Sequence, residues 1–158
     1  MRILSALFGL CSLSTSLAFA APSYNQATIS LDAAQRVAQA ALQQCQQNGH
    51  RIAVTVVDIS GRPKVQLVND GAFLHSALVS QRKAFTAVSR RLPTAVIEEA
   101  TQQDPAVAAI VNNLPDMITW GGGKLIEHQG QVIGAIGISG APGGSEDIQC
   151  ADAGLAAL

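Results

Sequence analysis

Charged and aromatic side chains are scarce in this 158-residue sequence, at 13% and 4% of its residues. The formal net charge is only -1, and no basic tail or run of basic and aromatic residues is present. These absences exclude a nucleic-acid-binding protein on electrostatic grounds. Hydrophobic residues make up 48% of the chain, which excludes intrinsic disorder and predicts one packed domain. We therefore expect the partner to be a small molecule or another copy of this chain.

The common motifs of metal, nucleotide and hydrolase sites are missing as well. His50, His75 and His128 do not have the spacing of a local metal site, and no C-x-x-C or H-E-x-x-H occurs. A zinc site or covalently attached haem is therefore not expected. The glycine-rich stretch 139–144 lacks the Lys-Ser/Thr pair of a phosphate-binding loop. No nucleophile elbow is present either.

The first twenty residues have the pattern of a secretory signal. A positive start is followed by a short apolar run and by Ala18-Phe19-Ala20, a cleavage signature of the A-x-A type. This pattern predicts a signal peptide at residues 1–20 and a periplasmic or secreted mature protein. Lipidation at Cys11 is the rival interpretation, although the bulky Leu10 before it fits a lipoprotein site poorly. No later segment is long and apolar enough to predict a membrane span.

Two cysteines, Cys45 and Cys150, remain in the mature chain. In an oxidising compartment two thiols favour one disulfide, which would close a loop of about 100 residues. The alternative is that both are buried as small hydrophobic residues. The sequence leaves these two possibilities open.

Hydrophobic periodicity predicts two β-hairpins separated by helices, after an extended lead-in at residues 21–29. Ser30 is expected to cap the first helix, which ends at Asn48-Gly49, and Ser145 to cap the last one. Residues 114–120 are expected to be extended. This order predicts an α+β domain over residues 30–158 with an antiparallel sheet. The expected hairpins span 52–68 and 124–139, and the intervening helices lie within 73–91, after Pro93 and after Asp104.

Several residues are candidates for a binding site, each with an ordinary structural alternative. His75 is the best placed of the histidines, in the first turn of a helix. Arg82 and Lys83 could anchor the carboxylates of a ligand or form a solvated helix face, and they project about 100° apart. The glycines at 121–123 fit a tight bend or the wall of a ligand pocket.

Several stretches of the sequence together resemble the GlcG/HbpS-like haem-binding family, which includes the C-terminal domain of PduO-type proteins. The most specific are TWGGGKL at 119–125 and GQVIGAIGISG at 130–140. The match extends over nearly all of residues 29–158, with its other stretches at 30–34, 54–61, 69–72, 82–87 and 147–154. The resemblance implies a profilin-like fold with a five-stranded antiparallel sheet flanked by helices. It also implies homo-oligomers and haem or a related tetrapyrrole as ligand.

Haem requires an apolar slot, polar groups for its propionates and one or two axial ligands. His75 and Met117 are the candidate iron ligands. The wider candidate site is His75, Arg82, Lys83, Met117, Thr119, Trp120, Gly121 and Gly122.

Three functions remain open at this point. The leading one is an exported haem-binding protein for haem storage, delivery or sensing. An enzyme that degrades haem or acts on another small molecule is the second. A ligand-free oligomeric interaction module is the third. The sequence does not decide whether any catalysis occurs.

Overall fold

The computed structural model describes residues 23–158, so the expected signal peptide at 1–20 lies outside the described residues. Both expected hairpins are present, and each pairs its two strands antiparallel. The strands are β1 (Ala53–Asp58), β2 (Pro63–Val68), β3 (Gly123–His128) and β4 (Gln131–Ser139). The helices are α1 (Leu31–Gln47), α2 (Ser76–Arg90), α3 (Thr94–Gln103), α4 (Pro105–Asn112) and α5 (Gly144–Leu155).

The sheet has four strands in the order β2-β1-β4-β3 within the described residues, so the expectation of five strands is wrong. The lead-in before α1 makes one backbone hydrogen bond to the sheet, from Ile29 N to Ile133 O, and remains without regular secondary structure. The expected extended segment at 114–120 starts with turns instead. Pro115 lacks an N–H donor, and Asp116 has a φ of 63° that turns the chain away from a strand direction.

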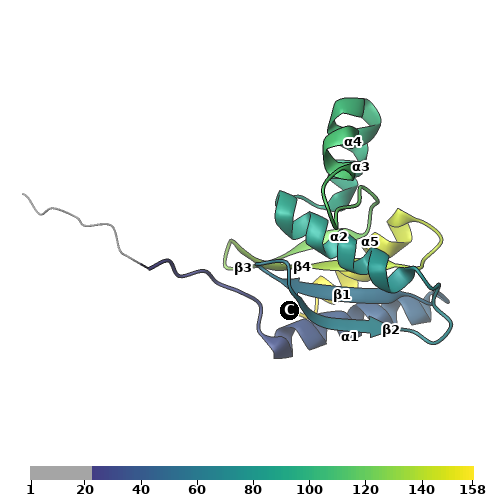
Figure 1. Ribbon diagram of the computed structural model, residues 1–158. Helices are drawn as coiled ribbons and strands as arrows, with labels where there is room; N and C mark the ends of the chain where they lie inside the picture. Colours follow the sequence, from purple (N-terminus) through teal and green to yellow (C-terminus); the bar gives the residue numbers. More distant parts are fainter. Residues whose placement is uncertain (1–22) are drawn as a thin grey trace, which may run out of the picture.

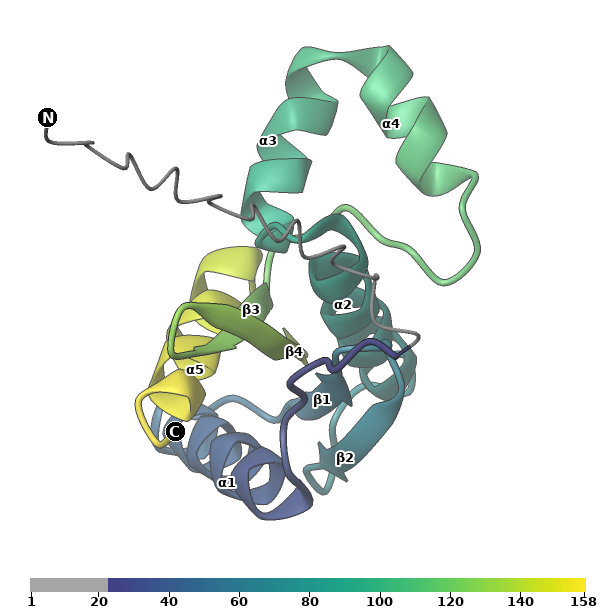
Figure 2. The same ribbon diagram turned by 90° about the vertical axis from the view of Figure 1, so that its left-hand side faces the viewer.

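The four strands lie between two helical layers (Figures 1 and 2). Helices α1 and α5 pack against each other and cover one face, and α2 covers the other face. Successive side chains of β1 point to opposite faces of the sheet, which explains this arrangement. Val54 and Val56 join the core under α1 and α5, whereas Val57 packs with residues of α2. Thr55 also faces α2, and its hydroxyl lies 2.8 Å from that of Ser80.

A close approach of α2 to the sheet requires small residues at the contact. Gly137 on β4 lies directly beneath α2, and a Cβ at this position would stand 2.0 Å from Ser80 O. Ala84 and Ala87 of α2 are fully buried nearby. The shortage of aromatic residues in the sequence therefore corresponds to a thin layer of alanine, glycine and valine between helix and sheet.

Helix α1 begins at the residue expected from the sequence. Ser30 is its N-cap, with extended backbone angles, and its Oγ accepts a hydrogen bond from Ala33 N at 3.2 Å. Asn48 is the C-cap, and Gly49 follows with a φ of 80°. Helix α5 differs from the expectation: Gly143 is its N-cap, and the Ser145 hydroxyl donates instead to the Glu146 carboxylate at 2.7 Å.

Ser30→Ala is expected to lower the free energy of unfolding by about 1 kcal/mol, because it leaves the Ala33 N–H without its capping acceptor. Ser30→Asp keeps an acceptor at this position and is the matched control. Urea denaturation of both variants measures the difference. Equal stability of Ser30→Ala and the wild type would show that the cap contributes nothing.

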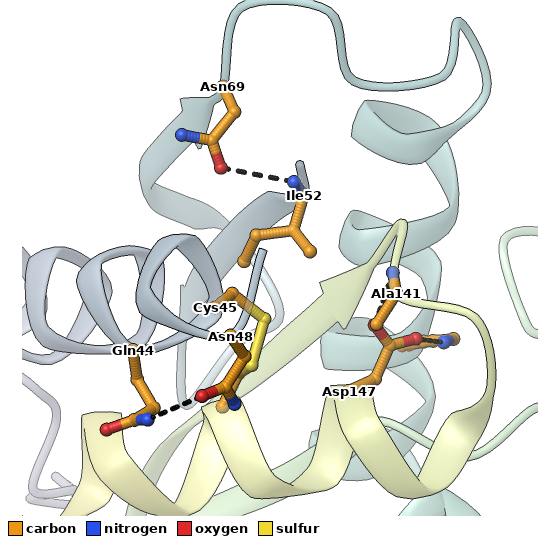
Figure 3. The surroundings of a disulfide bond; sticks show 9 residues. Gln44, Cys45, Asn48, Ile52, Asn69, Ala141 and Asp147 are labelled. Carbon is orange, nitrogen blue, oxygen red and sulfur yellow. Dashed lines mark hydrogen bonds and ion pairs between the residues drawn. A yellow bond between two sulfur atoms is a disulfide. The ribbon is translucent and has the colours of Figure 1, made fainter. Parts of the chain in front are cut away.

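Cys45 and Cys150 form a disulfide that joins α1 to α5 (Figure 3), with a Cα–Cα distance of 5.5 Å. Both residues are fully buried in the core between these helices and the sheet. The disulfide alternative of the sequence analysis is thus the one that the structure shows.

Helices α3 and α4 form an arm that extends from the body of the domain (Figures 1 and 2). Asp104 separates them and caps α4 by accepting a hydrogen bond from Ala106 N at 2.8 Å. The arm leaves Val96 and Ile110 about half exposed, at 47% and 59%. In the described part of the chain, no helix has the length and apolar character needed to cross a membrane.

Candidate functional site

A cleft of about 430 Å³ opens where the start of α2, the start of α5 and the beginning of β3 meet. The glycine-rich loop that connects β4 to α5 forms part of the lining, together with Trp120 and Glu98. The volume is within the range of small-molecule sites. The lining residues are Phe73, His75, Lys83, Glu98, Trp120, Gly121, Ser139, Gly140, Ala141, Pro142, Gly143, Gly144 and Asp147.

A buried ion pair forms the floor of the cleft. Lys83 Nζ on α2 lies 2.7 Å from Asp147 Oδ2 in the first turn of α5, and each side chain is only 4% exposed. Asp147 Oδ1 accepts a second hydrogen bond, from Ala141 N at 3.2 Å. The carboxylate therefore ties the loop 139–144 to α2, and the two charges compensate each other where water is excluded.

Burial raises the pKa of Asp147 above its ordinary value, while the charge and hydrogen bond of Lys83 and the Ala141 N–H partly offset that rise. Lys83 had been a candidate anchor for ligand carboxylates. Because its ammonium is already paired, it contributes little free positive charge to the cleft.

Gly122 is required by the ion pair rather than by a ligand. Its φ is 115°, and a Cβ there would stand 2.9 Å from Lys83 Nζ and 2.8 Å from Asp147 Cβ. Gly121, next to it, lines the cleft, and its N–H donates to Glu98 Oε2 at 3.0 Å. Gly121 therefore forms part of the cleft wall, whereas Gly122 lies in a tight bend against the ion pair.

Aromatic rings stand at the rim of the cleft. The rings of Phe73 and His75 are stacked, with centroids 5.7 Å apart and planes inclined by 3°. His75 is the N-cap residue of α2, but its side chain makes no capping hydrogen bond, and the residue is exposed. Trp120 is 56% exposed and lines the same cleft. The cleft thus offers flat apolar surfaces and one accessible imidazole.

The structure brings together four of the eight candidate residues in the cleft lining: His75, Lys83, Trp120 and Gly121. Gly122 lies behind the lining, against the ion pair. Arg82 lines a separate cavity of about 140 Å³ with Phe85 and Asp116. Adjacent helical residues point about 100° apart, so α2 cannot present Arg82 and Lys83 to one site.

Met117 and Thr119 are half-buried and do not line the cleft. They belong to the irregular segment before β3, which is attached to α2 by a hydrogen bond from Ile118 N to Thr86 Oγ1 at 2.9 Å. The two candidate iron ligands, His75 and Met117, therefore do not face a common cavity. Within residues 23–158, no three or more His, Cys, Asp or Glu side chains gather to hold a bare metal ion.

Sequence reasoning missed Phe73, Glu98, Asp147 and most of the loop 139–144 as parts of this cleft. One signal was available: Lys83 follows Val79 by four residues and precedes Ala87 by four, so it shares their buried helix face. A lysine on such a face requires a buried partner. The local sequence pattern did not identify this partner, Asp147, because it lies 64 residues away along the chain.

Comparison with known proteins gives a consistent result. The family model described as haem-degrading protein HbpS-like matches residues 29–156. An uncharacterised 15.0 kDa protein from the dhaT-dhaS intergenic region of Citrobacter freundii is 34% identical over 115 residues, which cover 72% of this chain and 81% of that protein.

Two solved structures extend the comparison. A double mutant of Streptomyces reticuli HbpS has a TM-score of 0.81 and 33% identity, and the match covers 93% of this chain and 98% of that one. A PduOC complex with haem has a TM-score of 0.76 and 27% identity, and the match covers 83% of this chain and 95% of that one. These findings confirm the resemblance seen in the sequence: the chain belongs to the HbpS-like family.

Proposed function

We propose that this protein binds haem or a related tetrapyrrole in the cleft beside α2. The observation that carries the proposal is the stacked Phe73–His75 pair at the rim of a 430 Å³ cleft. A flat macrocycle can pack on these rings and on Trp120. The complex of PduOC with haem and the description of the family support the same ligand.

The donor set of the cleft fits a porphyrin better than a bare metal ion. Haem would bring an iron that already has ligands of its own, so that the protein would need to supply only one or two more. His75 is the residue of the cleft that can act in this way, because its imidazole is exposed and is not used to cap α2. The glycine wall leaves space for a planar ligand to approach the backbone.

The chain is proposed to act outside the cytoplasm, in haem storage, delivery or sensing. The A-x-A signature after the first apolar run supports export. The buried Cys45–Cys150 disulfide supports it independently, because such bonds persist in oxidising compartments such as the periplasm.

Self-association is part of the proposal. Apolar side chains remain exposed on the α3–α4 arm and beside it, and pairing of these surfaces would remove them from water. They include Leu92, Val96, Ile110 and Leu114. Size-exclusion chromatography with light scattering tests this point, and a monomer at micromolar concentration would contradict it.

Haem degradation is the second candidate function, and the description of the family favours it. Storage and turnover differ in what happens after binding. When a reductant and oxygen are added, a stored haem retains a Soret band, which shifts if the iron is reduced, whereas a degraded haem loses the band.

Haemin titration of the purified protein is expected to give a saturable shift of the Soret band. His75→Ala is expected to weaken haemin binding about tenfold or more and to change the position of the band, because the proposed iron ligand is lost. His128→Ala, at the exposed β3–β4 turn, is the matched control and should bind as the wild type does.

Met117→Leu is also expected to retain binding, since Met117 does not line the cleft. A non-saturating response in the wild type would refute haem binding. Wild-type affinity and spectrum in His75→Ala would instead refute the assignment of the ligand.

A further inference from the structure

A second cavity of about 430 Å³ adjoins the cleft. The two share Phe73, Gly140 and Pro142 in their linings, so they meet along one wall. The second cavity lies outside the haem cleft proposed above. Its other lining residues are Gly49, His50, Arg51 and Gly71.

The second cavity is basic. Its lining includes Arg51 and His50 and no Asp or Glu residue, and the Arg51 guanidinium lies beside Gly71 of the same lining. The guanidinium of Arg51 makes no ion pair with any residue of the described part of the chain. An arginine in this state carries a permanent charge and up to five donors, which match a carboxylate in geometry.

Gly71 allows Arg51 to lie where it does. Its φ is 76°, and a Cβ at this position would stand 2.7 Å from Arg51 Nη1. A larger residue at position 71 would therefore displace the guanidinium. Arg51 and Phe73 line the same cavity, so one ligand can contact both.

The first cleft is less suited to anions than the second cavity. Its lining includes Glu98, which accepts a hydrogen bond from Gly121 N and does not line the second cavity, and its Lys83 is paired with Asp147. A ligand with an apolar ring and acidic arms is consequently favoured in one orientation, with its carboxylates at the Arg51 end and away from Glu98.

His50 has acidic neighbours of its own. The hydrogen bond from Ser145 lowers the pKa of the Glu146 carboxylate, and the nearby His50 adds a smaller effect in the same direction. Asp70 lies nearby as well, in a further cavity that Arg51 and His50 also line. A carboxylate ligand is therefore expected to depend chiefly on Arg51.

We propose that the cavity lined by Arg51 and His50 is the carboxylate subsite of the cleft and receives the propionates of a tetrapyrrole whose ring packs at Phe73 and His75. The inference rests on the proposed haem binding and adds to it the group that fixes the orientation of the ligand. Arg51 thus takes the role of carboxylate anchor that was expected of Arg82 and Lys83 from the sequence.

The test compares haemin with its dimethyl ester, which keeps the ring and the iron but lacks the acidic groups. Both ligands are titrated in the same buffer with a low concentration of detergent. Arg51→Met is expected to weaken haemin binding about tenfold while the affinity for the diester stays unchanged. Arg51→Lys should recover part of the loss, because it restores the charge without the planar geometry.

Arg62→Met is the matched control, since Arg62 is an exposed arginine in the β1–β2 turn and lines none of the cavities described above. Three results overturn the inference: unchanged haemin binding by Arg51→Met, equal weakening of haemin and diester, or the same loss in Arg62→Met. If the wild type binds neither ligand, the proposed function itself is wrong. If it binds both and only the Arg51 comparison fails, haem binding stands and the subsite does not.

Discussion

Replacing Cys45 and Cys150 together with alanine is expected to lower the free energy of unfolding by about 4 kcal/mol and the Tm by about 15 °C. The two residues are 105 positions apart, so the bond closes most of the domain into one loop. Its removal returns that loop's conformational entropy to the unfolded chain. The alanines also leave a small cavity between α1 and α5, where both cysteines are fully buried.

Guanidinium denaturation of the wild type with and without reductant measures this effect. Reductant is expected to destabilise the wild type and to have no effect on the double alanine variant, which serves as the control. A loss smaller than 1 kcal/mol in both experiments would mean that packing of α1 on α5 suffices.

Lys83→Met is expected to lower the free energy of unfolding by about 3–5 kcal/mol at neutral pH. The substitution leaves the Asp147 carboxylate buried at 3% exposure without its counter-charge. Lys124→Met is the matched control, because the Lys124–Asp152 pair is partly exposed, at 27% and 53%. We expect that variant to lose less than 1 kcal/mol.

The deficit of Lys83→Met is expected to depend on pH. Without Lys83, burial raises the pKa of Asp147 further, because the main opposing influences are gone. A carboxyl with a higher pKa in the folded than in the unfolded state contributes most stability below its unfolded pKa of about 3.9 and loses it as the pH rises through the folded pKa. The deficit should therefore be smallest near pH 4 and grow toward neutral pH.

Lys83→Met combined with Asp147→Asn is expected to recover more than half of the loss at neutral pH. Asparagine removes the unpaired charge and retains an oxygen for the Ala141 N–H. Denaturation curves of both variants at pH 4 and pH 7 test the account. A deficit that is the same at both pH values, or one that the second substitution deepens, would contradict it.

Local pattern predicted the elements of this fold well where they depend on neighbours in the sequence. Ser30 begins α1, Asn48-Gly49 ends it, and both hairpins form with their turns as expected. The expectation of extended chain at 114–120 was wrong at its start, because Pro115 and the positive φ of Asp116 turn the chain there. The fifth strand was implied by family resemblance alone and does not occur in residues 23–158.

The candidate site was predictable only in part. His75, Trp120 and Gly121 were found and do line the cleft, because a helix start and a glycine run are visible in the sequence. Arg82 was grouped with Lys83 although helical geometry separates them, and the two residues line different cavities. Arg51 had no local feature that marked it as a binding residue.

The sequence by itself determined the α+β class, the order of the elements and membership of the HbpS-like family. These follow from hydrophobic period, turn residues and contiguous motifs, which depend on residues only a few positions apart. The tertiary structure alone decided that Cys45 pairs with Cys150, that Asp147 neutralises Lys83, and that the cavity of Arg51 adjoins the cleft. Each of these joins groups distant along the chain, and their distances are fixed only once helices pack on both faces of the sheet.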